Sequence, residues 1–336
     1  MLNSHIKILI ALITVALVSL LTGCGSATPV PAKQPTPIPA WVNSILPNDT
    51  NEKIYGMSTG KNRESAINAA LADMIARLGT TIESSYKSNQ KVHNSLSSLD
   101  VEYDIKADVS KIKVNNYKVI KYHKLSYKEY AVMIETDKQK FIRGLRDDLE
   151  IKEKEINKRY EALKHENILT KYNVKKELAL SASKLMSIVL ILAELDATFE
   201  KKGHEDFIMR KQKEFVSQSS KLQFYVEGNG RSTLFIDKIK NYLAASGFKV
   251  SNSKNNSVLV KLHTTDNVSN NKLKIAVLTL KISVHENSNR IGGKSVIIKE
   301  RYNNSIGSVY KNASVHFEQD IKNQGINKLI GINLNI

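Results

Sequence analysis

Proline is confined almost entirely to one short stretch of this 336-residue chain. Five of the six prolines lie in "GSATPVPAKQPTPIPA", residues 25–40. Because proline has a fixed φ angle and no backbone N–H, such a stretch builds neither a helix nor a sheet ladder and favours an extended polyproline II conformation. We therefore expect residues 24–40 to form a tether and folded structure to begin at Trp41.

The segment before the tether has the pattern of a secretory signal. Residues 1–7 contain one lysine and no acidic residue, and residues 8–21 ("ILIALITVALVSLL") are uncharged. This order, with small residues at its end, is typical of a signal peptide. The apolar run is shorter than the roughly 20 residues that a membrane-spanning helix needs. We predict a signal peptide over residues 1–23.

The single cysteine of the chain, Cys24, lies between the apolar run and the tether. Together with Leu21, Thr22 and Gly23 it resembles the lipobox of bacterial lipoproteins, in which the thiol receives a diacylglycerol and becomes the new amino terminus. The resemblance implies that Cys24 is lipidated and holds the chain on a membrane, with a second acyl chain because one chain binds only marginally. The alternative is an ordinary signal peptide with an incidental cysteine. One thiol also excludes internal disulfides.

The residue after the cysteine bears on location within the envelope. In Gram-negative lipoproteins an aspartate at this position resembles a signal for retention in the inner membrane, and this chain has Gly25 instead. The resemblance therefore implies the outer membrane.

The formal net charge of +17 indicates anionic partners. We exclude nucleic acid because an exported protein does not meet it, and expect peptidoglycan, lipopolysaccharide or envelope proteins instead. The lysines are scattered without a dense basic block, so a solvated surface is an alternative explanation for the charge.

Residues 41–137 have the pattern of an α+β domain with a helix on a sheet. "KIYGMSTG" (53–60) is a short strand, and residues 62–78 have apolar side chains at helical spacing, with alanines that indicate a close approach to a sheet. Gly79 is placed to end this helix. "GTTIESSY" (79–86), "NYKVIKYHKLS" (116–126) and "KEYAVMIETD" (128–137) then predict three strands, with Trp41 docked at the edge of the domain.

These residues resemble a known family. Trp41 after a lipidated tether, "IYGMSTG", the alanine-rich "AINAALADMIARL" and "GTTIESS" are similar to the LPP-twenty family of bacterial envelope lipoproteins. The resemblance covers residues 41–137. It implies a membrane-associated lipoprotein without enzymatic activity, and several family members are tied to the outer-membrane parts of the flagellum.

Residues 138–221 predict a helical hairpin or a three-helix segment. One apolar stripe runs along residues 142–163, a second along residues 178–192, and residues 205–218 form a third amphipathic stretch. The run at 185–193 is too short to span a bilayer, and we expect it in the middle of the hairpin. Coiled-coil oligomerisation, with the chain as a homo-oligomer, is the alternative to packing within one chain.

Residues 222–336 predict a second α+β domain. A strand at 222–228 precedes an amphipathic helix at 232–250, which Gly247 ends. Alternating strands and a closing helix follow. The glycines of "IGGKS" (291–295) lack the spacing of a phosphate-binding loop, and we expect a hairpin turn there. In "GNGRST" (228–233) we expect Ser232 to cap the helix.

No catalytic, cofactor or metal site emerges from the sequence. The eight histidines are never three or four residues apart, no second cysteine exists, and Asp147, Asp148 and Glu150 lie on a charged helix face. "HED" (204–206) is the usual acidic start of a helix. We therefore expect a non-enzymatic, lipid-anchored binding or structural component of the envelope. The alternatives are an envelope enzyme or activator acting on peptidoglycan or lipid, and a flagellum-associated assembly lipoprotein.

Overall fold

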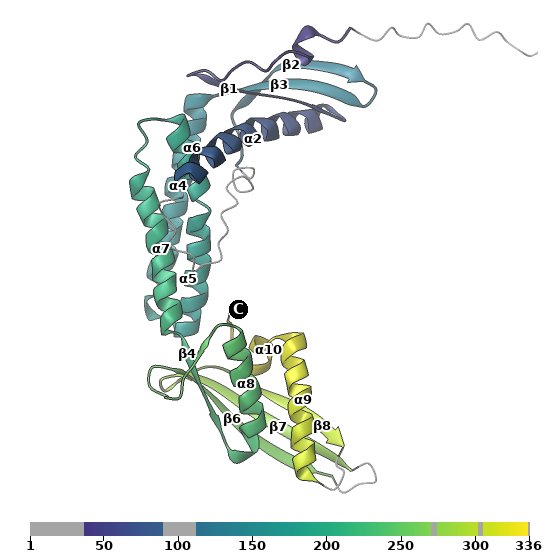
Figure 1. Cartoon of the computed structure of the whole chain (residues 1–336), viewed down its shortest axis with the longest axis vertical. Helices are drawn as coiled ribbons and strands as arrows, with labels where there is room; N and C mark the ends of the chain where they lie inside the picture. The colour runs from purple at the N-terminus through teal and green to yellow at the C-terminus, as the bar shows by residue number, and fades with distance from the viewer. Residues whose placement is uncertain (1–36, 90–111, 270–273, 302–304, 335–336) are drawn as a thin grey trace, which may run out of the picture.

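The structure is a computed structural model, and it describes residues 37–89, 112–269, 274–301 and 305–334. An N-terminal sheet, a helix bundle and a C-terminal sheet follow one another along the longest axis of the molecule (Figure 1). The fold is α+β, as expected from the sequence.

The N-terminal sheet has three antiparallel strands in the order β1-β3-β2. Their bounds are β1 Lys53–Gly60, β2 Tyr117–Ser126 and β3 Glu129–Asp137. Helix α2 (Arg63–Asn89) covers one face of the sheet. On the central strand β3, Val132 and Ile134 are completely buried beneath it.

Helix α2 packs unusually close to the sheet at Gly56. A Cβ atom at this position would lie inside van der Waals contact of the carbonyl oxygen of Ala70. Ala66 and Ala70 are both fully buried, so small side chains on the helix and a glycine on the strand make the close approach possible. The close packing expected from the alanines is confirmed.

The end of α2 differs from the expectation. The helix continues through Gly79 to Asn89, so the strand expected at 79–86 is wrong. Of the three strands expected after the helix, the described residues of this part form two, β2 and β3. The β-branched residues after Gly79 favour a strand only if a sheet neighbour is available. Among the described residues the sheet consists of β1, β3 and β2, and the hydroxyl of Thr80 donates to the carbonyl oxygen of Ala76 within the helix at 2.9 Å.

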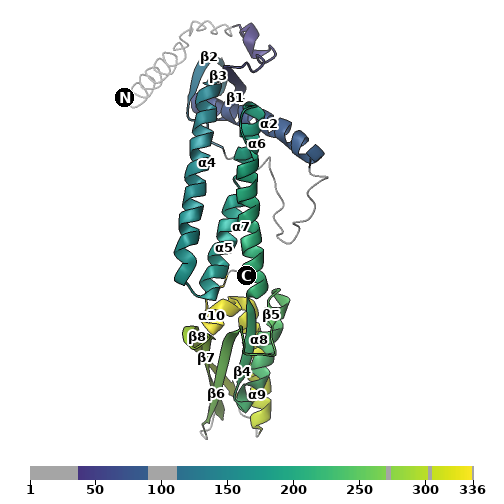
Figure 2. The same ribbon diagram turned by 90° about the vertical axis from the view of Figure 1, so that its left-hand side faces the viewer.

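Strand β3 leads directly into the bundle without a loop. Asp137 ends the strand and caps helix α4 (Lys138–Glu161), accepting a hydrogen bond of 2.9 Å from the N–H of Lys140. The chain then forms the short helix η3 (Ala162–His165), and α5 (Ile168–Ser183), α6 (Met186–Leu195) and α7 (Lys202–Lys221) follow. Together these helices form a long bundle between the two sheets (Figure 2).

The apolar stripes predicted for the bundle are buried within this single chain. The stripe of α4 includes Leu145 and Leu149, and that of α5 and α6 includes Leu178 and Leu192. Helices α5 and α6 form a nearly continuous run, Ile168–Leu195, which within the described residues is the one helical stretch long and apolar enough to cross a membrane. In this structure 56% of its most apolar 18-residue stretch is buried inside the protein, as expected for a core helix of a bundle.

The bundle contributes to two hydrophobic cores. One core joins α2 and β3 to α4, α6 and the start of α7. The other joins the first half of α5 and the end of α7 to the C-terminal sheet, where the ring of Tyr172 lies 5.4 Å from Phe215 and 5.6 Å from Phe248. Each end of the bundle therefore shares a hydrophobic core with the sheet next to it.

The C-terminal part is a five-stranded sheet in the order β5-β4-β6-β7-β8. Strand β4 is parallel to β5 and β6, and the remaining pairs are antiparallel. The strands are β4 Gln223–Gly228, β5 Lys249–Val250, β6 Val258–Val268, β7 Ile275–Glu286 and β8 Asn289–Arg301. The helices are η4 Gly230–Ser232, α8 Thr233–Ala245, α9 Ile306–Gln324 and α10 Ile326–Ile330.

Helix α8 ends as the sequence indicates. Gly247 has a φ of +82°, the left-handed region that favours glycine. The N–H of Phe248 donates to the carbonyl oxygen of Leu243 and that of Gly247 to Ala244. This pair of bonds is the Schellman motif.

Two local expectations for this part are wrong. The β7–β8 hairpin turns at Asn287 and Ser288, so the glycines of 291–295 lie inside strand β8 and not in the turn. There, the N–H of Gly293 donates to the carbonyl oxygen of Gly331 at 2.9 Å, and side chains at this crossing would collide. Ser232 accepts no capping bond from α8. Its hydroxyl instead lies in a buried network with Asn229 and Thr264.

Candidate functional site

The predicted lipidation site lies outside the described residues. Leu21, Thr22, Gly23 and Cys24 all precede residue 37, where the described chain starts. Lipidation of Cys24 therefore stays a prediction from the sequence.

Two of the acidic residues considered in the sequence, Asp148 and Glu150, form local ion pairs. Asp148 pairs with Lys152 at 2.5 Å and Glu150 with Lys154 at 3.5 Å, each one turn further along α4. At the start of α7, Nδ1 of His204 lies 2.8 Å from a carboxylate oxygen of Glu153. Within the described part of the chain, no group of three or more His, Cys, Asp or Glu side chains is placed to hold a metal ion.

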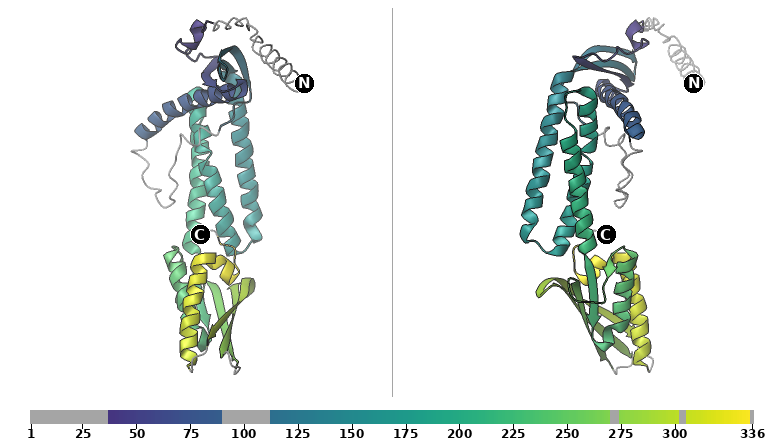
Figure 3. Two further views of the ribbon diagram at one scale, coloured as in Figure 1. Left: turned by 90° about the vertical axis from the view of Figure 1, so that its right-hand side faces the viewer. Right: turned by 60° about the vertical axis from the view of Figure 1, so that its left-hand side comes forward.

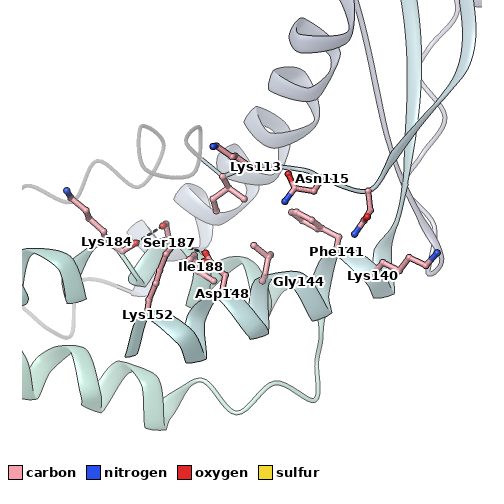
Figure 4. A pocket seen from close by; sticks show the side chains of 13 residues that line it. Lys113, Asn115, Lys140, Phe141, Gly144, Asp148, Lys152, Lys184, Ser187 and Ile188 are labelled. Atoms are coloured by element: carbon pink, nitrogen blue, oxygen red, sulfur yellow. Dashed lines mark hydrogen bonds and ion pairs between the residues drawn. The ribbon is translucent and has the colours of Figure 1, made fainter. Parts of the chain in front are cut away.

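A cavity of about 540 Å³ lies where the N-terminal sheet meets the bundle. Figure 4 shows Asn115 and Phe141 toward one end, and Lys152, Lys184 and Ser187 toward the other. The full lining comes from residues 112–116, from the first half of α4 and from the junction of α5 and α6.

The cavity is electropositive. Four lysines line it, and its single carboxylate, that of Asp148, is paired with Lys152. Its charge suits a small anion. Its wall at Ile112 adjoins residues 90–111, which lie outside the described residues.

A second and larger candidate is the outer face of the C-terminal sheet. Along β6, β7 and β8 the even-numbered residues are mostly buried under α8 and α9, and the odd-numbered residues point away from these helices. Figure 3 shows the helices gathered on one side of the sheet. This follows from the strand period of two, which places successive side chains on opposite faces.

The outer face of these three strands is basic. Its ionisable side chains, apart from the residues next to the β7–β8 turn, are those of Lys261, His263, Lys281, His285, Lys299 and Arg301. No carboxylate shares this face on the described residues of β6, β7 and β8. The nearest one outward on β4, Glu227, is paired with Lys254 at 2.6 Å.

The register brings these cations together from distant parts of the sequence. His263 on β6 is the direct cross-strand partner of Lys281 on β7. Next to them, Ile297 on β8 is opposite Thr279 and is 63% exposed. The face thus combines cations, hydroxyls and an exposed apolar side chain on one side of the sheet, which suits binding to an extended anionic partner.

This surface was not predicted from the sequence. Counting lysines along the chain shows no dense block, because each strand supplies only one or two of the cations. A usable signal was present, since the outward positions of β6, β7 and β8 hold Lys, His, Arg and uncharged residues but no Asp or Glu.

Comparisons with known proteins add two structural similarities. A secreted protein of the human pathogen Helicobacter pylori has a TM-score of 0.45 at 14% identity, covering 82% of this chain and 98% of that one. A minor lipoprotein of Acinetobacter baumannii has a TM-score of 0.25 at 15% identity, covering 32% of this chain and 91% of that one. No family model matches the sequence, and no curated protein matches it.

Similarities at this level carry no argument about function. The resemblance to the LPP-twenty family is matched by no family model and stays a prediction.

Proposed function

We propose that this chain is a lipid-anchored, non-enzymatic component of the bacterial envelope, which holds a basic binding surface away from the membrane. The observation that carries the proposal is the outer face of β6, β7 and β8, with its cations and no carboxylate among the described residues. A solvated face normally mixes both signs of charge, so a face of one sign favours an anionic partner.

The position of this face in the molecule supports a spacer role. The lipobox and the tether precede the N-terminal sheet, and the basic face lies at the other end of the bundle (Figure 1). Helix α4 alone has 24 residues, which corresponds to about 36 Å at 1.5 Å per residue. A lipid at Cys24 would therefore leave the basic face well beyond the surface of the bilayer.

The proposed ligand is an anionic glycan polymer of the envelope, with peptidoglycan as the first candidate and lipopolysaccharide as the second. Gly25 after the lipobox supports the outer membrane as the site of attachment, from which a periplasmic chain would face peptidoglycan. A protein that is anchored in one layer and binds a polymer outside it needs a distance between its anchor and its binding face, and the bundle provides this distance.

Attachment is tested by fractionating cells that produce the wild type or Cys24→Ser. We expect the wild type in the outer-membrane fraction with the mass of the attached lipid, and the variant as an uncleaved or soluble species. Equal fractionation and equal mass would contradict the lipid anchor.

Ligand binding is tested by co-sedimentation with purified peptidoglycan sacculi. We expect the triple variant Lys261→Gln, Lys281→Gln, Lys299→Gln to lose most of the binding. The control removes the same charge elsewhere, with Lys158→Gln, Lys164→Gln and Lys311→Gln, all exposed and on helices outside this face. Equal loss in both variants would show that net charge alone is responsible and would contradict a site on this face.

A further inference from the structure

The hairpin between β2 and β3 ends in an exposed aromatic ring between two cations. Tyr127 and Lys128 form its two-residue connection, and Tyr127 is 83% exposed. The ammonium groups of Lys124 and Lys128 lie 5.9 and 6.0 Å from the centroid of the Tyr127 ring. Tyrosine and lysine side chains both have an apolar body and a polar tip, and such side chains are favoured at the interface between lipid and water. The tip of this hairpin combines the two types.

The rest of strand β2 also combines exposed aromatic and apolar side chains with lysines. It is an edge strand, and its Tyr117, Ile120 and Tyr122 are 37%, 39% and 45% exposed. Residues 117–128 contain four lysines and no acidic residue. Lysines on an edge strand hinder the addition of another strand, so the edge itself is a poor site for pairing with a peptide or a second copy.

The same strand lies next to the entry of the tether. Trp41, in helix η1 (Ala40–Val42), lies beneath Lys121 of β2, whose ammonium group is 5.9 Å from the centroid of the indole ring. Cys24 precedes Trp41 by 17 residues, and a chain of this length spans at most about 60 Å. A lipid at Cys24 would therefore keep a bilayer within reach of the hairpin, at the end of the molecule opposite the C-terminal sheet (Figure 1).

We propose that the β2–β3 hairpin docks on the anionic lipid surface that holds the lipid of Cys24. Tyr127 lies among the headgroups, and Lys124 and Lys128 lie against lipid phosphates. Cations near an anionic leaflet are attracted to it within about a Debye length, roughly 10 Å at moderate salt. The inference rests on the proposed lipid anchor and adds a second contact, which would fix the orientation of the bundle relative to the bilayer.

The test places a fluorescent reporter at the tip. Trp41 is the only tryptophan, so a full-length protein with Trp41→Phe and Tyr127→Trp has a single tryptophan, at position 127. This protein is purified from membranes and reconstituted into vesicles of brominated phosphatidylcholine, with or without phosphatidylglycerol. Flotation of the vesicles reports the lipid anchor, and quenching of the tryptophan by bromine reports docking of the tip.

We expect all variants that keep Cys24 to float with both kinds of vesicle. Quenching should be at least about twofold greater with phosphatidylglycerol, and high salt or Lys124→Gln with Lys128→Gln should remove the difference. Arginine at both positions should restore it. The matched control Lys158→Gln with Lys164→Gln removes the same charge from the end of α4 and from η3, at the other end of the bundle, and should leave quenching unchanged.

The outcomes separate the two proposals. A protein that floats without quenching in either vesicle overturns docking and leaves the anchor intact. A protein that does not float contradicts the proposed lipid anchor, and it also contradicts the docking of the hairpin, which depends on that anchor. If quenching is absent and the lysine variant instead loses co-sedimentation with peptidoglycan, the hairpin is a polymer site and membrane docking is overturned.

Discussion

The side-chain amide of Asn173 on α5 donates a hydrogen bond of 2.8 Å to the backbone carbonyl of Asn333, 160 residues later in the chain. Near it, the N–H of Ile168 at the start of α5 donates to the carboxylate of Glu286 at 3.1 Å. These two bonds join the lower end of the bundle to the end of β7 and to the last described residues of the chain. The bundle and the C-terminal sheet are therefore connected by these hydrogen bonds as well as by the passage of α7 into β4.

Asn173→Ala tests this connection. We expect the loss of the hydrogen bond to lower the free energy of unfolding by about 1 kcal/mol, and amide hydrogen exchange near Asn333 to accelerate. The measurement is urea unfolding together with hydrogen exchange. Asn312→Ala, at an exposed position of α9, is the control and should be neutral within error. Unchanged exchange near Asn333 in the first variant would contradict the role given to Asn173.

Two glycine substitutions should act in opposite directions. Gly56→Ala places a Cβ against the carbonyl oxygen of Ala70 and should destabilise the protein by about 1–3 kcal/mol. Gly144→Ala on α4 meets no atom within 4 Å and should stabilise the protein by about 0.5–1 kcal/mol, because alanine loses less backbone entropy in a helix. Chemical denaturation of both variants measures the difference. Equal effects would show that α2 does not pack closely on β1.

The buried hydroxyl of Ser232 should be coupled to that of Thr264. The two oxygens lie 2.8 Å apart, and Ser232 also donates to Asn229. We expect Ser232→Ala to cost about 1–2 kcal/mol, and a double-mutant cycle with Thr264→Val to show a coupling energy of roughly 1 kcal/mol. Additive effects in the unfolding free energies would instead indicate a cap that acts on α8 alone.

Tyr310 should make the free energy of unfolding depend on pH in the alkaline range. Burial, and then its hydrogen bond of 2.8 Å to Asp266, raise the pKa of Tyr310 from 10.0 to about 12. Because the folded protein holds this proton more tightly, the contribution of Tyr310 is complete below the unfolded pKa of 10.0 and is lost as the pH rises through about 12.

The comparison of wild type with Tyr310→Phe isolates this effect from the titration of the lysines. The difference in unfolding free energy between the two proteins should be constant below pH 10.0 and should shrink between there and about 12. Urea unfolding over a series of pH values measures it. Parallel pH profiles for the two proteins would contradict the assignment.

Periodicity was sufficient to predict most of the elements. The stripes of α4, α5 and α6 repeat over many turns, and Gly247 ends α8 because its left-handed φ suits no other residue as well. Gly79 has the same sequence signal, but its environment is the interior of a helix that continues to Asn89. A glycine can therefore mark the end of a helix in the sequence and still lie inside one, because tertiary context overrides such weak local preferences.

The candidate surfaces were harder to predict, because strand register assembles them. His263 and Lys281 are 18 residues apart in the sequence and directly opposite in the sheet. Alternation predicts which side chains share a face of one strand, but not which strands are neighbours or which face the helices cover. The aromatic and basic character of residues 117–128 was visible in the sequence, yet the place of β2 at the sheet edge was not.

The separation of 160 residues between Asn173 and Asn333 also has a consequence for biosynthesis. The apolar side chains of Leu169 and Tyr172 are made long before the residues of α9 and α10 that share their core. Until those residues have joined the core, the first half of α5 is an unfinished hydrophobic surface, and we expect a chaperone to bind this segment while the chain is unfolded.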